Sequence, residues 1–378
     1  MMRGIKADTA AGRRRAALLW QLLALAILLG LFAFLAYNTQ ENMRLRGIRS
    51  GFDFLGDPAG FDIGESLLAF SASDPYWKAF LVGLLNTLRV AIVGIALASV
   101  LGVVIGMGRL SRNLLLRWLC GAYIELFRNL PLLLQLLVWY FMLTAMLPPV
   151  ADALQLGELV YLSKSGLAFP APLWDSGHLW AGAGFAAGCV LWVLLRRGLG
   201  LPARLSFLLP LALALGGWLA GGMPASFEIP ERGIFNISGG ITVTPEFLAL
   251  LVGLSLYTAA FIAENVRAGI QSVPWGQLEA AGAVGLSRRQ TMRWVVFPQA
   301  LRVIIPPTAN QYLNLTKNSS LAVAIGYPDL ISITNTSLNQ TGRAVECIAV
   351  MMAMYLLISL LTAWLMHRHG RQAQLEQP

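Results

Sequence analysis

Eight apolar runs recur along the chain and determine its predicted architecture. Each run is close to or above the minimum of about 17 residues that a helix needs to cross a bilayer, and charged residues gather between the runs. The pattern therefore predicts an all-α integral membrane protein with about eight transmembrane helices. The eight runs are residues 18–37, 80–107, 130–147, 179–195, 205–221, 246–263, 303–325 and 345–366.

The first apolar run differs from a secretory signal. It follows a segment with five basic residues and one acidic residue, and it continues for 20 residues without a charge. A signal peptide has a shorter apolar region that ends in small residues of the Ala-x-Ala type, which this run lacks. We therefore expect an uncleaved helix with its N-terminus in the cytoplasm, although Arg44, Arg46 and Arg49 beyond the run argue for the opposite orientation.

The segments between the runs alternate in charge. Arginines dominate residues 109–128, whereas acidic residues dominate 148–175. With eight crossings, 19 of the 28 Lys and Arg residues fall in segments assigned to the cytoplasm. Because basic residues concentrate in cytoplasmic loops, this topology is self-consistent and predicts that both termini lie in the cytoplasm.

The runs also suggest four parts of the chain. Residues 1–79 form a transmembrane helix and an external segment, and residues 80–147 form the first part of a helical core. Residues 148–245 contain external loops and an inserted helical hairpin, the 179–221 hairpin, whose turn carries basic residues. We interpret this hairpin as a packing insertion rather than a part of the transport path. A short β-hairpin is expected at Gly239-Gly240, and residues 246–378 complete the core.

Composition excludes several function classes. The chain is 57% hydrophobic and 12% charged, whereas soluble proteins are about 25% charged. The three cysteines are widely separated and form no metal-binding pattern with the three histidines. The sequence contains no Gly-Lys dipeptide and therefore no phosphate-binding P-loop. We expect no cofactor on this chain, and if ATP drives the protein, another subunit must bind it.

A polar segment between the sixth and seventh runs, residues 277–302, has the signals of two short helices joined by a tight turn. Pro274 suits the start of the first helix, and Gly285 suits the left-handed residue after its end. Ser287 and Gln290 have the spacing of a capping box, so a second helix should begin at once. That helix is expected to stop before Pro298.

The same segment also fits a DNA-binding helix-turn-helix, which has a tight glycine turn and a basic second helix. Its position argues against this alternative, because apolar runs flank it closely on both sides. We therefore predict no nucleic-acid partner. Small residues from Ala280 to Ala283 let the segment approach another protein's backbone closely, as expected of a docking element.

At these residues the sequence resembles a known family, the membrane-spanning subunits of bacterial ATP-binding-cassette importers, and within it the polar amino-acid permeases. The family signature is Glu-Ala-Ala, three residues, Gly, nine residues, then an aliphatic residue, one further residue, Leu and Pro. This chain has Glu279-Ala280-Ala281, Gly285 and Val295-Val296-Phe297-Pro298, in which Val295 and Phe297 depart mildly from the pattern. The resemblance covers residues 80–147 and 246–366 and is greatest to the larger subunits of general L-amino-acid permeases.

The resemblance implies a five-helix core of the type I importer permeases, to which the first helix and the inserted hairpin are added. It also implies a pair of permease subunits, usually a heterodimer with a paralogue, and a periplasmic amino-acid-binding protein. Two cytoplasmic ATPase subunits, which bind ATP and Mg²⁺, would dock on the Glu279 loops. The residues assigned to this coupling are Glu279, Ala280, Ala281, Gly285 and Pro298.

The seventh run contains a polar stripe at helical spacing. Its members recur at i, i+4, i+7 and i+8 and so share one face of a helix. Polar groups within a membrane are costly and border a pathway or the bundle interior, and Lys317 suits the attraction of a substrate carboxylate. The alternative, left open here, is that Lys317 turns to the interface or pairs inside the bundle while the amides bond neighbouring helices. The stripe comprises Asn310, Asn314, Lys317 and Asn318.

These observations predict the permease subunit of an amino-acid importer in the bacterial inner membrane, with the lipid bilayer as its surroundings and no catalytic site of its own. The alternative is an ion-coupled secondary transporter of small polar solutes. That class predicts inverted repeats and acidic residues inside the spans, whereas here no repeat is apparent and the charge inside the spans is mainly Lys317.

Overall fold

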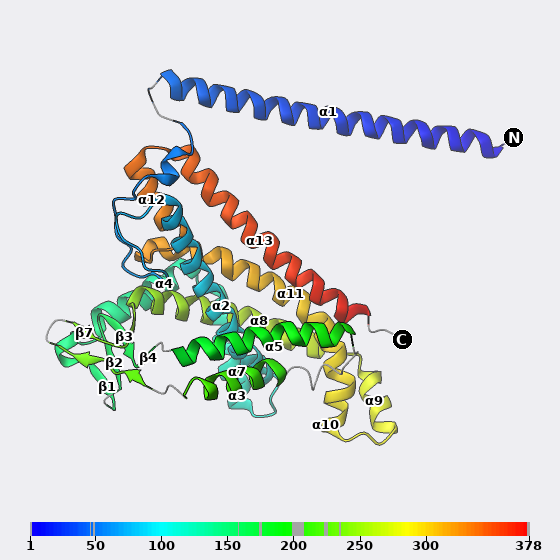
Figure 1. Cartoon of the computed structure of the whole chain (residues 1–378). Helices are drawn as coiled ribbons and strands as arrows, with labels where there is room; N and C mark the ends of the chain where they lie inside the picture. The colour runs from blue at the N-terminus through cyan, green and yellow to red at the C-terminus, as the bar shows by residue number, and fades with distance from the viewer. Residues whose placement is uncertain are drawn as a thin grey trace. The chain divides into compact units, whose positions relative to one another are not determined.

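The protein is mostly helical in the computed structural model (Figure 1). The structure describes residues 2–45, 47, 50–157, 159–173, 176–198, 208–222, 226–233 and 236–375, without the side chains of 2–17, 176, 196–198 and 365–375. The chain divides into two compact units. Unit 1 combines Met1–Leu85 with Leu330–Leu361, and unit 2 combines Asn86–Asp329 with Thr362–Pro378.

Five described helices are long and apolar enough to cross a membrane. They are α1 (Met2–Leu45), α2 (Tyr76–Arg109), α5 (Ser176–Gly198), α8 (Pro245–Gln271) and α13 (Ala344–Leu375). A sixth crossing is possible if α3 (Leu114–Asn129) and the apolar segment Leu132–Met146, which meet at 105°, count as one span. The last segment contains α4 (Leu132–Phe141) and one π-helical stretch, Met142–Met146.

The two remaining predicted spans are also helices but differ in character. The helix α7 (Leu208–Ala220) is apolar but short in its described part, and α11 (Phe297–Asn318) is amphipathic, with polar residues along one side. The helical membrane fold is therefore confirmed, and the eight predicted runs all correspond to helical segments.

Unit 1 packs a small core around the segment that precedes α2. A short 3-10 helix, Asp53–Gly56, places Phe54 against Tyr76 with ring centroids 5.5 Å apart. Between the seventh and eighth predicted runs, where the sequence shows no apolar run, the structure contains a further helix, α12 (Leu330–Thr341). Its apolar residues Leu330 and Ile333 are buried in the unit 1 core.

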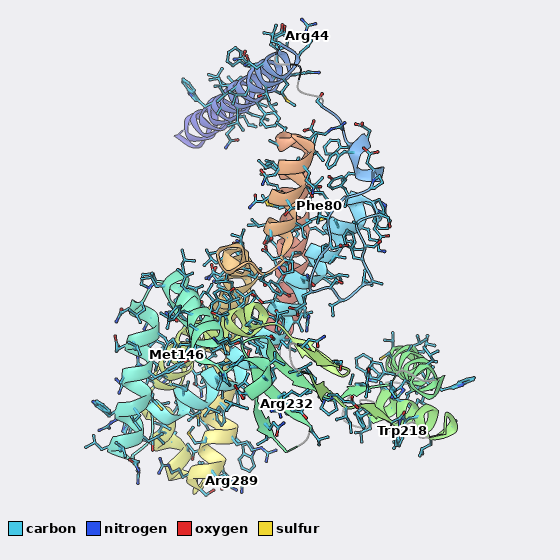
Figure 2. All side chains as sticks on the ribbon, turned by 90° about the vertical axis from the view of Figure 1, so that its left-hand side faces the viewer. Arg44, Phe80, Met146, Trp218, Arg232 and Arg289 are labelled. Atoms are coloured by element: carbon cyan, nitrogen blue, oxygen red, sulfur yellow. The ribbon has the colours of Figure 1, made fainter. Side chains whose placement is uncertain are left out.

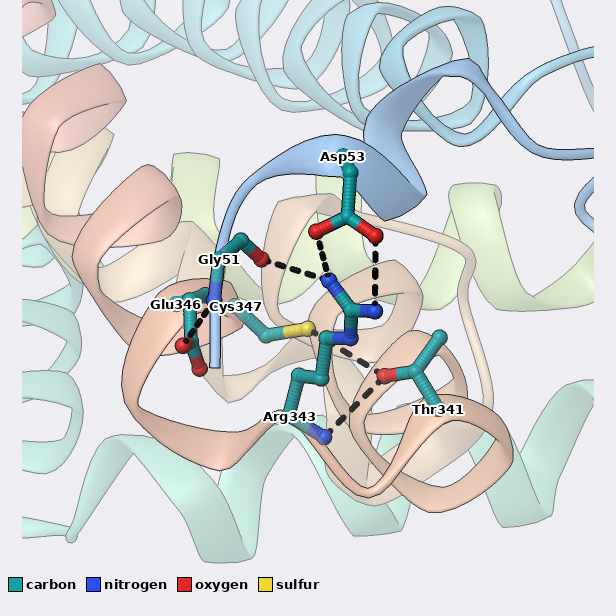
Figure 3. Close-up of polar contacts among 6 residues, drawn as sticks. All are labelled: Gly51, Asp53, Thr341, Arg343, Glu346 and Cys347. Atoms are coloured by element: carbon teal, nitrogen blue, oxygen red, sulfur yellow. Dashed lines mark hydrogen bonds and ion pairs between the residues drawn. The ribbon is translucent and has the colours of Figure 1, made fainter. Parts of the chain in front are cut away.

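An ionic cluster joins the segment before α2 to the turn between α12 and α13 (Figure 3). The Arg343 guanidinium donates to the Gly51 carbonyl at 2.7 Å and to both carboxylate oxygens of Asp53. The Gly51 amide donates to Oε1 of Glu346 at 2.8 Å. Since Arg343 and Glu346 are both buried, the cluster fixes the path of the segment before α2 within unit 1.

Unit 2 is built around α8, which packs against α3, α4 and α11. Glycines allow the close approaches: a Cβ on Gly106 of α2 would lie 2.7 Å from the Ala263 carbonyl, and one on Gly253 of α8 would lie 2.6 Å from Leu136 of α4. Small residues at such contacts let transmembrane helices pack backbone to backbone. The position of α8 matters for function, because its end leads directly into the 277–302 segment.

Short strands occupy the loops on either side of the inserted hairpin. A four-stranded antiparallel sheet has the order β1-β2-β3-β8, and two further pairs join β4 to β5 and β6 to β7. The expected β-hairpin at Gly239-Gly240 is wrong, because β7 and β8 on either side of these glycines pair with β6 and β3 instead. The strands are β1 (Leu154–Leu156), β2 (Val160–Ser163), β3 (Gly166–Phe169), β4 (Ala171–Pro172), β5 (Phe227–Glu228), β6 (Glu231–Arg232), β7 (Ile237–Ser238) and β8 (Ile241–Val243).

The 179–221 hairpin forms as α5 and α7, which pack against each other along their length. A Cβ on Gly188 of α5 would lie 2.5 Å from Cα of Pro210 on α7, so this glycine is required for the close contact. Figure 2 labels Trp218 on α7. The basic turn predicted between the two helices, with Arg204, lies outside the described residues, as do the side chains of Arg196 and Arg197.

Candidate functional site

The segment between α8 and α11 folds as two short helices side by side, labelled α9 and α10 in Figure 1. The first, α9 (Trp275–Ala283), begins directly after Pro274. At its end Gly285 adopts a left-handed φ of 77°, and the amides of Leu286 and Gly285 donate to the carbonyls of Ala281 and Gly282, each at 3.0 Å. These two bonds form a Schellman motif, which confirms the predicted glycine stop.

The second helix, α10 (Arg288–Thr291), begins with the predicted capping box. The Ser287 amide donates to Oε1 of Gln290 at 2.9 Å, and the Gln290 amide donates to Oγ of Ser287 at 3.4 Å. The expected stop before Pro298 is wrong, because a π-helical stretch, Met292–Val296, leads without a break into α11. Pro298 is the second residue of α11, and the backbone beside it stays helical, with Phe297 at φ −58° and ψ −45°.

The five predicted coupling residues differ in exposure. Glu279, Ala280, Gly285 and Pro298 are exposed, whereas Ala281 is the buried residue of α9. Because a methyl group is the whole side chain of Ala281, α9 can lie close to the second arm of the loop, with which it makes contact at α10 and at Met292–Val296. The exposed members leave one side of α9 open to a partner.

One contact in the loop was missed by the sequence analysis. The indole Nε1 of Trp275 donates to Oε1 of Glu279 at 2.8 Å. The two residues are four apart on α9, so the helical i, i+4 spacing was available as a signal. This hydrogen bond holds the Glu279 carboxylate in one position on the surface of the loop.

The loop surface combines basic and apolar side chains. The second arm of the loop exposes three arginines, Arg288, Arg289 and Arg293, and Figure 2 labels Arg289, which lies near the start of this arm. Two tryptophans are also exposed, Trp275 at 72% and Trp294 at 58%. The two indoles add apolar area to a loop surface that is otherwise polar and basic.

Near the end of α8, Glu264 and Arg267 form an ion pair on the helix surface. The Arg267 Nε donates to Oε2 of Glu264 at 2.8 Å, and the other guanidinium nitrogens contact Oε1 of Glu264 and the side chain of Gln271. A bidentate pair three residues apart stiffens the last turns of α8, where the chain leaves for the loop.

The polar stripe lies on the open side of α11. Asn310, Asn314 and Lys317 are exposed and Asn318 is half-buried. The opposite side of the helix is buried, through Ile304, Thr308, Leu315 and Thr316. No carboxylate among the described residues pairs with Lys317. The shared face is thus confirmed, while the role of the stripe remains a prediction.

A second polar contact of α11 was not anticipated. The hydroxyl groups of Ser99 on α2 and Tyr312 on α11 lie 2.8 Å apart, and the Ser99 hydroxyl also lies 2.6 Å from the carbonyl of Ile95. The hydrogen bond between Ser99 and Tyr312 links α2 to α11 next to the polar stripe. In the described part of the chain, no group of His, Cys, Asp and Glu residues is arranged to hold a metal ion.

Comparison with known proteins gives a consistent picture. The sequence matches the family model described as "Binding-protein-dependent transport system inner membrane component" over residues 94–373. It is 45% identical over 358 residues to the "General L-amino acid transport system permease protein AapQ" of Rhizobium johnstonii, covering 92% of this chain and 90% of that protein.

Two further relatives are similarly complete. YhdX of Escherichia coli is 46% identical over 369 residues, covering 94% of this chain and 93% of that protein. The "Glutamate/glutamine/aspartate/asparagine transport system permease protein BztB" of Rhodobacter capsulatus is 35% identical over 411 residues, covering 94% and 93%. These matches span both the coupling residues and α11.

Proposed function

Because the chain belongs to the family of binding-protein-dependent transport system inner membrane components, we propose that it is the permease subunit of an ATP-driven importer of L-amino acids. Family membership makes it a multi-pass inner-membrane transport subunit. The observation that carries the proposal is the compact loop on which Glu279 and Ala280 are exposed and Ala281 is buried. The names of the relatives support amino acids as the cargo.

In this proposal the 277–302 loop transmits work from two ATPase subunits, which hold ATP and Mg²⁺. The Schellman turn and the capping box give the loop a fixed shape. A partner that binds α9 can therefore displace the loop without unfolding it. The displacement passes along the uninterrupted helical path from α10 into α11. Alternating access then results from rigid-body movement of helices, and this chain needs no catalytic site.

The stripe on α11 supports a second permease subunit. An isolated chain would expose Lys317, Asn310 and Asn314 on a membrane helix, and a charged side chain at the bilayer centre costs about 2.5–3.5 kcal/mol or more. A paralogous permease opposite α11 would cover this face and leave a polar path between the two subunits. The amino acid would move along that path from the periplasm to the cytoplasm, with Lys317 attracting its carboxylate.

The orientation follows from the same assignment. With the 277–302 loop in the cytoplasm, eight crossings put both termini in the cytoplasm as well. The β1–β8 sheets then face the periplasm, where the amino-acid-binding protein delivers its cargo. The basic residues exposed on the loop support this orientation, since such residues concentrate on the cytoplasmic side.

The coupling role is tested by charge reversal at Glu279. We expect Glu279→Arg to abolish co-purification of the ATPase with the detergent-solubilised permease pair and to stop uptake in proteoliposomes. Glu231→Arg makes the same change on the exposed strand β6 and is expected to leave co-purification intact. Normal ATPase binding and uptake by Glu279→Arg would refute the coupling assignment.

The substrate path is tested separately at Lys317. In a complex that inserts and binds its ATPase normally, we expect Lys317→Met to lower uptake of acidic and neutral amino acids at least tenfold, because an interaction with a charged group is worth about 1.5–3 kcal/mol. Lys164→Met, in the external turn between β2 and β3, serves as the control. Unchanged uptake of every amino acid would remove Lys317 from the pathway.

A further inference from the structure

Three residues of different chemical character lie on the exposed face of α9. Trp275, Glu279 and Gly282 recur at i, i+4 and i+7 and so share one face, opposite the buried Ala281. The indole is 72% exposed, and a Cβ on Gly282 would meet no atom within 4 Å. This face therefore offers an aromatic ring, a carboxylate and an open backbone surface to whatever binds α9.

The first two of these residues are linked. Helical side chains lean toward the N-terminus, so the Glu279 side chain lies over the turn that contains Trp275, and the indole N–H donates to its Oε1 at 2.8 Å. Among the described residues Glu279 makes no other side-chain hydrogen bond. A free glutamate on a helix surface samples several rotamers, and the indole N–H selects the one in which the carboxylate lies beside the ring.

We propose that Trp275 is a positioning residue for the contact between Glu279 and the ATPase. The inference rests on the proposed function, which assigns the ATPase to this loop. The indole N–H holds the Glu279 carboxylate in its docking position before the partner arrives, so less side-chain entropy is lost on binding. The indole ring provides the apolar part of the same contact, as aromatic residues do at the centre of protein interfaces.

This proposal specifies the partner surface. The ATPase cleft must have an apolar wall next to the groups that meet Glu279, because the ring and the carboxylate lie side by side on α9. We also expect acidic residues at the rim of that cleft, because charge complementarity would pair them with the exposed arginines of the loop, Arg288, Arg289 and Arg293. Of the two exposed tryptophans of the loop, Trp275 is the one that reaches the motif glutamate.

A double-mutant cycle tests the inference in the complete permease pair, reconstituted in nanodiscs and titrated with the purified ATPase. Trp275→Phe keeps an aromatic ring but removes the N–H, and Glu279→Gln removes the carboxylate. We expect Trp275→Phe to weaken ATPase binding about three- to tenfold and to lower the number of amino acids moved per ATP. In the Glu279→Gln background, Trp275→Phe is expected to have little further effect.

A matched control is available on α3. Trp118 is 64% exposed, and Trp118→Phe makes the same chemical change away from the loop, so it should leave ATPase binding unchanged. Both tryptophans are exposed, so neither change disturbs a packed core.

The possible failures are distinguishable. If Glu279→Gln weakens ATPase binding and Trp275→Phe does not, the positioning role is wrong and the proposed function stands. Fully additive effects of the two substitutions would also overturn it, because Trp275 would then act independently of Glu279. If neither substitution nor Glu279→Arg affects ATPase binding, the coupling role of the loop itself is refuted.

Discussion

The packing of α2 against α8 makes a sharp prediction for Gly102→Ala. A Cβ at position 102 would lie 2.6 Å from both Cβ and Cγ2 of Ile262 and 3.1 Å from the carbonyl oxygen of Ala259. Ordinary contacts of a Cβ atom fall between 3.4 and 4 Å. Because the Cβ of Ile262 is attached to the backbone, no rotamer change can move it. The two helices must therefore separate by about 1 Å, a shift that overpacked cores resist.

The magnitude follows from the cost of overpacking, which is about 1–3 kcal/mol for an added methylene in a well-packed core. At about 2–4 °C per kcal/mol, Gly102→Ala should lower the Tm of the detergent-solubilised protein by about 2–12 °C. Gly30→Ala on α1 is the matched control, since a Cβ there would meet nothing within 4 Å. It makes the same substitution in a transmembrane helix without any packing cost.

Thermal unfolding followed by size-exclusion chromatography of the heated samples measures both variants under one condition. We expect Gly30→Ala to have a Tm equal to or slightly above that of the wild type, because alanine favours the helix, and Gly102→Ala to have a Tm below both. Equal Tm values for Gly102→Ala and Gly30→Ala would mean that α2 and α8 do not approach at this glycine, and the arrangement of unit 2 around α8 would be wrong.

Three further predictions concern the loop and unit 1. Gly285→Ala should cost about 1 kcal/mol through its left-handed φ of 77°, whereas Gly282→Ala in the adjacent helix should stabilise α9, as amide exchange of the loop would reveal. Arg343→Lys should lower the Tm, because lysine cannot reproduce the two-pronged bond to a carboxylate, and an unchanged Tm would contradict the cluster in Figure 3. The side chain of Lys78 lowers the pKa of Asp74, so the stability it contributes is present above the unfolded pKa of about 3.9 and lost as pH falls below it. Lys78→Met should therefore reduce the fall in Tm between pH 6 and pH 3, and an unaltered pH profile would refute this pair.

Local rules predicted the loop well. The glycine stop at Gly285 and the capping box of Ser287 and Gln290 depend on a few adjacent residues, and the structure contains both. The apolar runs likewise predicted the transmembrane helices, because the bilayer sets their length. The shared face of the α11 stripe followed from helical periodicity alone.

Features that depend on distant partners could not be predicted in this way. The strand β3 pairs with β8 across the whole inserted hairpin, so no local signal indicates the pairing. The helix α12 has a polar sequence, and its Leu330 and Ile333 are buried in the unit 1 core together with Phe54, which lies far away in the sequence. Tertiary packing, rather than intrinsic propensity, stabilises such a helix.

The prolines of α11 explain why one boundary was misplaced and where the helix can bend. A proline ends a helix when the chain cannot continue past its missing N–H, but here the backbone next to Pro298 stays helical directly after the π-helical stretch Met292–Val296, so the helical path from Arg288 continues. That path is about 30 residues long, or roughly 45 Å at 1.5 Å per residue. Pro306 and Pro307 lie inside α11, where each removes an N–H that the preceding turn would have received. In the proposed coupling, a displacement of the loop passes along this path beyond Pro298, and we expect the helix to bend most easily at Pro306-Pro307, just before the polar stripe begins at Asn310.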